Sequence, residues 1–246
     1  MSTKLFSKYA MQNPEFTILS TRPLPASLLE EAAHKGFHID CLSFIDTEPI
    51  LNDEVEVQIK AATAYTTVVF TSMNAVEAVH HYLGQKPGWR IYAIGNTTKL
   101  LAEAHLGTIA GTADNAGALA DTIISRGEKE VTFFCGDIRR DELPDKLKEA
   151  GIELNEVMVY RTIETPHVLD KAYHGILFYS PSAVHAFFNS NSQLPESTDL
   201  FAIGTTTAAA LNTYTTNRIY VADSPSKEQL VRDAMDYYRN PKQPNE

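Results

Sequence analysis

LFAIGTTTAAAL, from Leu200 to Leu211, decides the fold of this 246-residue chain, because IYAIGNTTKLLA, from Ile91 to Ala102, nearly repeats it. Each copy runs from apolar residues through Ile-Gly into threonines and then into a helical pattern. This order predicts a strand, a tight turn at Gly95 or Gly204, and a helix capped by a hydroxyl side chain. The free N–H groups at the start of such a helix can bind an anion.

Further pairs of similar segments extend this internal repeat. Two pairs keep nearly the same spacing, Phe70–Val79 with Phe178–Phe187 and Thr112–Ile123 with Val221–Ala234. A last pair breaks the order, because Ile18–Ile39 resembles Phe133–Leu154. One unit therefore lies whole in the middle of the chain, and its partner is split between the chain ends. The alternative, a chance likeness between α/β segments, is disfavoured by the number of pairs.

Strand and helix patterns alternate along the whole chain, which predicts doubly wound parallel sheets. Short, wholly apolar segments such as Thr67–Thr71 are typical of buried parallel strands. About ten strands for two units gives five each, so the fold class is α/β with two flavodoxin-like domains. We expect a discontinuous first domain of residues 1–44 and 168–246, a second domain of 50–160, and linkers at 45–49 and 161–167. Ligands of such sheets bind beyond the carboxyl ends of the strands, here in a cleft between the domains.

The charge balance limits the partners of the protein. The net charge is −10, which argues against binding to nucleic acid or to an anionic membrane surface. The two cysteines, Cys41 and Cys135, do not form a CxxC motif and suit a reducing compartment. No apolar run approaches the ~20 residues of a membrane span, and the start, MSTKLFSKYAMQNPEF, reads as a loose arm rather than a signal peptide. We expect a cytoplasmic monomer.

Common motifs for metals, nucleotides and hydrolysis are missing from the sequence. His80 and His81 stand on a predicted helix without a second ligand pair at metal spacing, so we interpret them as solvated. P-loop, GxGxxG, GxSxG and HExxH patterns do not occur. The sequence predicts no metal site.

An ordered set of motifs between Phe16 and Tyr238 resembles the uroporphyrinogen-III synthase family. The set comprises TRP at Thr21–Pro23, FTSMNAV, AIGNTT, CGDIRRDELPDKLKEAG, VYRT at Val159–Thr162, FYSPSAV, AIGTTTA and ADSPSKEQL. The resemblance implies two domains joined by a two-stranded linker. It also implies closure of linear hydroxymethylbilane to uroporphyrinogen III in haem biosynthesis, with inversion of ring D and loss of water. It implies no metal, no organic cofactor, and contact with the preceding pathway enzyme as a possible partnership.

Tyr160 matches the family's tyrosine after the long strand predicted at Glu153–Tyr160. A phenol keeps its proton at neutral pH, because its usual pKa is about 10, and it can donate that proton to the leaving hydroxyl. The alternative is an aromatic side chain that packs the hinge.

Substrate carboxylates need binding groups, and the resemblance indicates Thr98, Thr206 and Thr207 in the two glycine turns. Helix capping, worth ~1 kcal/mol each, is the structural alternative, and both roles are expected together. The same pair of roles applies to the serine turns. The complete set of expected substrate-binding residues is Arg22, Ser72, Asn74, Thr98, Gly136, Arg139, Ser180, Ser182, Thr206 and Thr207.

An acidic protein that binds a polycarboxylate must use local groups, namely helix N-termini and a few cations. Arg22, Arg139 and Arg140 are the best placed. The alternative for the last two is a solvated face paired with Asp141 and Glu142. Arg161, next to Tyr160, either lines the cleft or braces the linker.

A hypothesis of another class stays open, a two-domain protein that binds or senses a small anion without catalysis. Hinge, cleft and capping turns serve either function. Tyr160 and the ordered motifs favour the enzyme.

Overall fold

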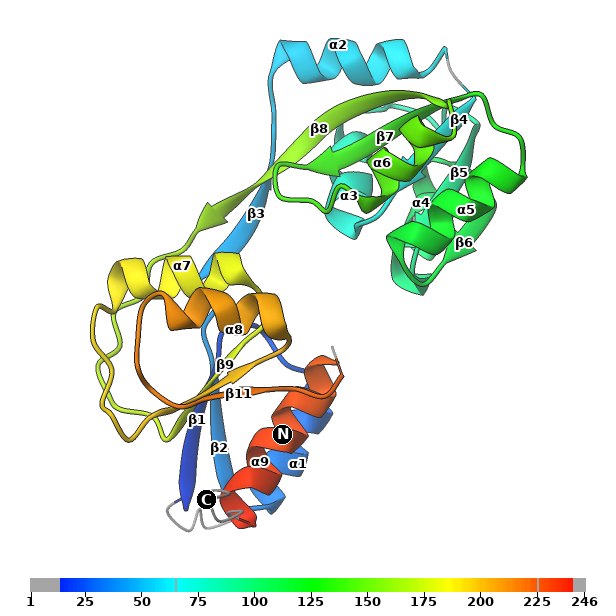
Figure 1. Cartoon of the computed structure of the whole chain (residues 1–246). Coiled ribbons are helices and arrows are strands. Elements are labelled where there is room, and N and C mark those ends of the chain that lie inside the picture. Colours follow the sequence, from blue (N-terminus) through cyan, green and yellow to red (C-terminus); the bar gives the residue numbers. More distant parts are fainter. Residues whose placement is uncertain (1–13, 65, 225, 241–246) are drawn as a thin grey trace, which may run out of the picture. The chain divides into compact units, whose positions relative to one another are not determined.

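The computed structural model describes residues 14–64, 66–224 and 226–240. The chain divides into two compact units (Figure 1), and most of the expected N-terminal arm lies outside the described residues. The described part of Met1–Asp46 and Glu164–Glu246 forms the split unit, and Thr47–Ile163 forms the middle unit. Both division points fall inside the segments expected as linkers. The exact domain boundaries given above stay a prediction.

The split unit contains a five-stranded sheet in the order β11-β10-β9-β1-β2, and all neighbouring strands are parallel. Its strands are β1 (Phe16–Ser20), β2 (Phe37–Cys41), β9 (Gly175–Phe178), β10 (Asp199–Ala202) and β11 (Ile219–Val221). Its helices are α1 (Ala26–His34), α7 (Pro181–Ser190), α8 (Thr205–Asn212) and α9 (Lys227–Arg239). Figure 1 shows α7 beside α8 and α1 beside α9. Each pair covers one face, so Leu19 packs with α7 and α8, whereas Ile18 packs with α1 and α9.

The middle unit contains a six-stranded sheet in the order β3-β8-β7-β4-β5-β6. Its strands are β3 (Ile45–Pro49), β4 (Thr67–Phe70), β5 (Trp89–Ile94), β6 (Gly107–Ala113), β7 (Glu130–Gly136) and β8 (Glu153–Glu164). Its helices are α2 (Asp53–Ala62), α3 (Met73–Tyr82), α4 (Asn96–His105), α5 (Ala116–Ser125) and α6 (Glu142–Glu149). One core cluster joins the sheet to α2, α3 and α4, and another joins it to α5 and α6.

The sequence repeat explains the two strand orders. Counted along the chain, the split unit has the flavodoxin order 2-1-3-4-5, whereas β4 to β8 of the middle unit have the order 3-2-1-4-5. The repeat pairs β4 with β9, β5 with β10, β6 with β11, β7 with β1, and β8 with β2. With this pairing the two orders become identical. The two units therefore share one sheet topology, and they differ in the strand at which the chain enters it. This difference explains why the last pair of repeated segments falls out of order.

Strands β4, β9 and β10 are buried along their whole length, as expected for parallel strands that are covered on both faces. Strand β8 continues beyond Tyr160, the end expected from the sequence, because β3 lies beside it as an added edge strand. The strand order reverses between β4 and β7 in the middle unit and between β9 and β1 in the split unit. Ligands of doubly wound sheets bind at such points, beyond the carboxyl ends of the strands.

Candidate functional site

The reversal point of the middle unit lies where β4 ends at Phe70 and β7 ends at Gly136. Ser72 is the N-cap of α3, and its Oγ accepts a hydrogen bond from the Ala75 amide at 3.2 Å. The expected capping role of Ser72 is thus confirmed. The cap fixes the hydroxyl at the carboxyl end of β4, next to the end of β7.

A bulge in β8 brings Tyr160 to the same place. Cys135 of β7 pairs with Met158, but the next residue, Gly136, pairs with Tyr160, so the register shifts by one residue at Val159. A Cβ built on Gly136 would lie 2.5 Å from Cε2 of Tyr160 and 2.8 Å from its hydroxyl oxygen. Gly136 therefore makes room for the phenol ring. This role is a steric one and differs from the substrate contact expected from the sequence.

The Tyr160 phenol is hydrogen bonded to Ser72. The Ser72 hydroxyl donates to the phenol oxygen at an O···O distance of 3.1 Å. The phenol oxygen is the acceptor in this bond, so the Tyr160 proton is not used in it. Tyr160 is half-buried and packs against the core of the middle unit. The ring is thus packed in place, as the structural alternative predicts, and its proton is free for transfer, as the catalytic role requires. The two roles expected for Tyr160 are compatible.

A pocket of about 170 Å³ lies beside Tyr160. Its other lining residues are Thr47, Glu48 and Pro49 of β3 and Asn74, Glu77, Ala78 and His81 of α3. Asn74 was expected at the site, and His81, which is exposed as the sequence predicted, also borders the pocket. Its spacing from Asn74, two helical turns along one face of α3, was the available signal.

Arg161 braces the linker strands, as one of its two expected roles. From β8 it forms an ion pair with Glu48 of β3, and its Nε donates to Oε1 at 2.5 Å. This pairing neutralises Glu48, and it leaves Glu77 as the pocket carboxylate without an ion pair among the described residues.

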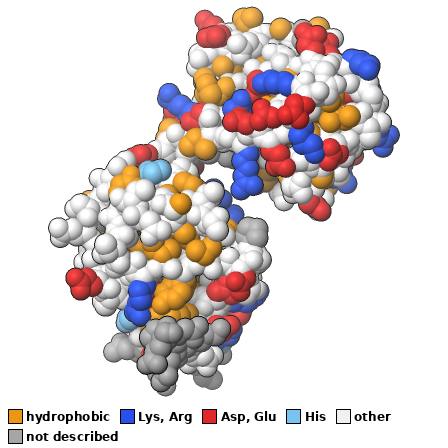
Figure 2. All heavy atoms as spheres, in the orientation of Figure 1, with side chains coloured by type: hydrophobic (Ala, Val, Ile, Leu, Met, Phe, Trp, Pro, Cys, Tyr) orange, Lys and Arg blue, Asp and Glu red, His pale blue; other side chains and the backbone are white. Residues whose placement is uncertain are grey.

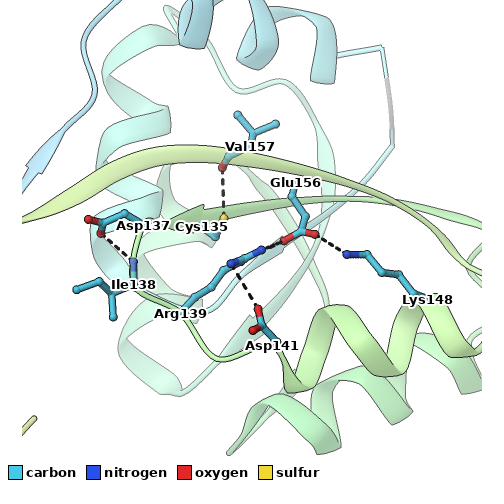
Figure 3. Close-up of polar contacts among 8 residues, drawn as sticks. All are labelled: Cys135, Asp137, Ile138, Arg139, Asp141, Lys148, Glu156 and Val157. Atoms are coloured by element: carbon cyan, nitrogen blue, oxygen red, sulfur yellow. Dashed lines mark hydrogen bonds and ion pairs between the residues drawn. The ribbon is translucent and has the colours of Figure 1, made fainter. Parts of the chain in front are cut away.

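Arg139 is not a free cation. Figure 3 shows its guanidinium between Glu156 of β8 and Asp141, which lies 3.5 Å from Nη1. Lys148 also reaches Glu156, at 2.8 Å. Burial raises the pKa of Glu156, but hydrogen bonds from Lys148 and Arg139 outweigh it and leave the pKa lowered. The expected pairing with Asp141 is confirmed, and the main partner, Glu156, was not foreseen because it lies on another strand. Arg140 is exposed and has no ion pair among the described residues.

The neighbours of Arg139 in Figure 3 hold the end of β7 in place. Cys135 is buried, and burial raises the pKa of its thiol to about 11, so it stays uncharged. The Asp137 carboxylate accepts hydrogen bonds from the amides of Ile138 (2.8 Å) and Thr162 (2.9 Å). Asp137 thereby ties the turn after β7 to β8, on the strand that carries Tyr160.

The two glycine turns differ from the expected pattern. The N-caps of α4 and α8 are Gly95 and Gly204, and neither helix start has a side-chain cap. Thr98 and Thr207 are buried, whereas Thr206 is exposed. The prediction that the hydroxyls of these threonines cap the helices is therefore wrong, because glycine occupies the cap position and the threonines lie inside the first turn. The uncapped N–H groups remain available to an anion.

Only one of the two glycines needs its conformational freedom. Gly95 has a φ of 76°, a value that side chains disfavour, whereas Gly204 is extended with a φ of −174°. The expectation of a glycine-dependent turn is correct at Gly95 and wrong at Gly204.

The split unit places three expected residues at the same edge of its own sheet. Ser180 caps α7, accepting from the Ala183 amide at 3.2 Å, and its Oγ lies 3.1 Å from that of Ser182. Arg22 follows β1, is half-buried, and has no ion pair among the described residues. Burial and the charge of Arg22 lower the pKa of Lys227, which shows that the two cations are neighbours. The sequence reading missed Lys227, although it lies in the quoted motif ADSPSKEQL.

A second serine–tyrosine pair lies in the split unit and differs in exposure. Ser20 Oγ lies 3.2 Å from the Tyr179 hydroxyl, but its shorter hydrogen bond, at 2.6 Å, goes to the Arg22 carbonyl, and Tyr179 is buried. Burial raises the pKa of Tyr179 to about 12. Of these two phenols, Tyr160 is the half-buried one, and it lines the pocket described above.

A family model described as Uroporphyrinogen-III synthase HemD matches residues 26–232. The chain belongs to the uroporphyrinogen-III synthase family. The uroporphyrinogen-III synthase of Chlorobaculum parvum is 27% identical over 220 residues, which cover 79% of this chain and 88% of that protein. The Saccharomyces cerevisiae enzyme is 27% identical over 155 residues, 53% of this chain and 56% of that protein.

Solved structures of uroporphyrinogen-III synthases share the two-domain α/β fold. The Helicobacter pylori structure has a TM-score of 0.68 at 20% identity and covers 90% of this chain and 99% of its own. A mutant Thermus thermophilus structure has a TM-score of 0.58 at 16% identity, with coverage of 92% and 100%. The family resemblance and the α/β fold class expected from the sequence are confirmed. The chain is an enzyme of haem biosynthesis rather than the anion-binding alternative.

Most of the side chains expected at the site fall into two groups in the structure. Ser72, Asn74, Gly136 and Tyr160 come together in the middle unit, and Arg22, Ser180 and Ser182 share the corresponding edge of the split unit. Within the described ranges, no group of three or more His, Cys, Asp or Glu side chains could hold a metal ion. In the same ranges, no helix has the length and apolar character that crossing a membrane requires.

Proposed function

We propose that this protein is a uroporphyrinogen-III synthase, a cyclising carbon–oxygen lyase that converts hydroxymethylbilane into uroporphyrinogen III with inversion of ring D. The observation that carries the proposal is the Tyr160 phenol, which Ser72 and Gly136 hold in place with its own proton free. A phenol held in this way suits the first chemical step, because hydroxide is a poor leaving group and departs more readily when it is protonated.

Tyr160 donates its proton to the hydroxyl as the carbon–oxygen bond breaks, and water leaves. The electron-rich substituted carbon of ring D attacks the resulting azafulvene carbon and gives a spiro intermediate. Rearrangement inverts the ring and closes the macrocycle, and the proton that ring closure releases returns to the phenolate. Because the linear substrate closes spontaneously to isomer I, the protein must also favour the folded conformation that leads to isomer III.

Substrate carboxylates bind to local positive groups of this acidic chain. Helix starts without side-chain caps, at α4 and α8, supply N–H groups, and the exposed Thr206 hydroxyl lies at the second of them. Arg22 and Lys227 supply cationic charge, and neither forms an ion pair among the described residues, although the charge of Glu228 acts on Lys227. Figure 2 shows acidic and basic side chains interspersed on the surface of the middle unit, in keeping with local recognition.

The remaining expectations belong to the same proposal. The protein acts in the cytoplasm as a monomer, without metal or organic cofactor, and takes its substrate from the preceding pathway enzyme. The net charge of −10 supports the absence of a nucleic-acid partner.

A coupled ring-closure assay tests the function. Hydroxymethylbilane is generated in place, and the oxidised products are separated into isomers I and III. We expect isomer III to dominate only when the protein is present, and Tyr160→Phe to lower kcat by about 10²-fold. Isomer I alone with the wild-type protein would overturn the proposal.

A further inference from the structure

The Ser72 hydroxyl uses both of its hydrogen-bonding functions within the described structure. Its oxygen accepts from the Ala75 amide at 3.2 Å, and its proton is given to the Tyr160 oxygen at 3.1 Å. A hydroxyl has one proton to donate. Tyr160 is therefore the acceptor in this hydrogen bond, and its own proton can be donated to another group.

Donation to the phenol oxygen favours proton release. As the Tyr160 proton leaves, negative charge grows on the oxygen, and a hydrogen bond to the charged form stabilises it. The backbone amide of Ala75 adds to this, because it fixes and polarises the Ser72 hydroxyl.

The pocket beside Tyr160 has the wrong charge for a substrate carboxylate. None of its lining residues is Lys or Arg, and Glu77 contributes a carboxylate without an ion pair among the described residues. Such a lining suits the uncharged hydroxymethyl end of a pyrrole ring, where positive charge develops when the hydroxyl leaves, while the carboxylates of that ring lie outside the pocket. Glu77 is exposed, so solvent screens its carboxylate and its stabilisation of that charge is modest.

We propose that Ser72 is a positioning residue that orients and polarises Tyr160, and that the α3 pocket receives the hydroxymethyl-bearing pyrrole ring of the substrate. This inference rests on the proposed function. In this inference Ser72 acts on Tyr160 and does not bind a substrate carboxylate. The pocket for the leaving group and the cationic groups for the carboxylates are then different sets of residues.

Ser72 variants separate donation from capping. Ser72→Ala removes both, Ser72→Thr keeps both, and Ser72→Asp keeps a good cap but offers an acceptor in place of a donor. Asn115 is the matched control, because it caps α5 of the same unit through its Oδ1, 2.9 Å from the Ala118 amide, and lies outside the pocket lining. Asn115→Ala therefore reports the effect of losing a cap alone.

We expect Ser72→Ala to lower kcat on the order of tenfold with little change in KM, since one hydrogen bond to a developing charge is lost. Ser72→Thr restores kcat, and Ser72→Asp lowers kcat without the loss of Tm seen in Ser72→Ala. Asn115→Ala lowers Tm and leaves kcat unchanged. In a Tyr160→Phe background, Ser72→Ala causes no further loss of kcat, because its effect passes through the phenol.

Equal kcat values for Ser72→Asp and wild type would overturn the positioning role. So would a loss of kcat that is the same with and without Tyr160. Failure of the wild-type protein to make isomer III is a different outcome, which rejects the proposed function itself.

The pocket has its own test. Glu77→Gln removes the charge and keeps the shape, and we expect kcat to fall about threefold or more while KM stays close to wild type. Glu54→Gln, an exposed carboxylate on α2 outside the pocket, is the control and keeps the wild-type kcat. A KM that falls in Glu77→Gln with kcat unchanged would show that the pocket binds a substrate carboxylate, and would overturn this assignment.

Discussion

Gly136 and Tyr160 face each other across the β7–β8 bulge so closely that a Cβ on Gly136 would lie 2.8 Å from the phenol oxygen. The chain therefore has no room for any side chain at position 136 while the ring keeps its place. The same bulge turns the phenol towards Ser72 of the neighbouring strand end. The position of the Tyr160 phenol thus depends on a residue that has no side chain.

Gly136→Ala is expected to displace the Tyr160 ring. We expect a loss of about 1–3 kcal/mol in the free energy of unfolding from overpacking, and a larger proportional loss of kcat. Denaturant unfolding and the isomer assay measure the two effects. Gly84→Ala is the control, because nothing lies within 4 Å of a Cβ at Gly84. A Gly136→Ala enzyme with wild-type kcat would contradict the steric role.

Thr98→Val separates packing from substrate contact. Thr98 is buried in the first turn of α4 and does not cap the helix, so the free energy of unfolding should be equal to that of wild type or higher. If its hydroxyl contacts the substrate, as proposed from the family, KM should rise severalfold. Thermal unfolding and initial rates distinguish these effects, and a destabilised Thr98→Val would show an intramolecular hydroxyl contact instead.

Lys227→Gln probes the cationic pair of the split unit. Burial, and then the nearby charge of Arg22, lower the pKa of Lys227 against the opposing charge of Glu228, and neither cation forms an ion pair among the described residues. We expect KM to rise severalfold with kcat little changed, and KM to depend less on salt than in wild type. Arg126→Gln, which removes an exposed cation in the middle unit, should leave both parameters unaltered.

Glu31 makes the packing of α1 on α9 sensitive to acid. Hydrogen bonds from Arg232 and then Lys35 lower its pKa from 4.5 to about 2. The folded state therefore binds the proton less tightly, and the stabilisation is present above about pH 4.5 and lost as the pH falls towards 2. In urea unfolding, Glu31→Gln should be less stable than wild type at pH 7 and approach it at pH 3. A constant difference between the two pH values would reject this linkage.

The parts of the fold that follow local patterns were predictable from the sequence. The buried four-residue strands β4 and β9 consist mostly of apolar residues, and the serine caps at Ser72 and Ser180 precede their helices as the pattern indicates. The internal repeat indicated the split unit, because segments that fold alike carry similar strand and turn residues wherever they stand in the chain. The ordered motifs, Tyr160 among them, identified the family before any contact was known.

Only the tertiary structure decided how the site is built. The register shift that sets Tyr160 over Gly136 depends on how β7 pairs with β8, and pairing is a non-local choice that local sequence does not encode. The burial of Thr98 depends on which face of a short helix packs on the sheet, and the neutralisation of Arg139 depends on Glu156, which lies on another strand. The sequence by itself determined the elements, the repeat and the residue types at the strand ends. The fold determined which of them touch, because hydrogen bonds, steric fit and charge pairing act over a few ångströms between residues far apart in the chain.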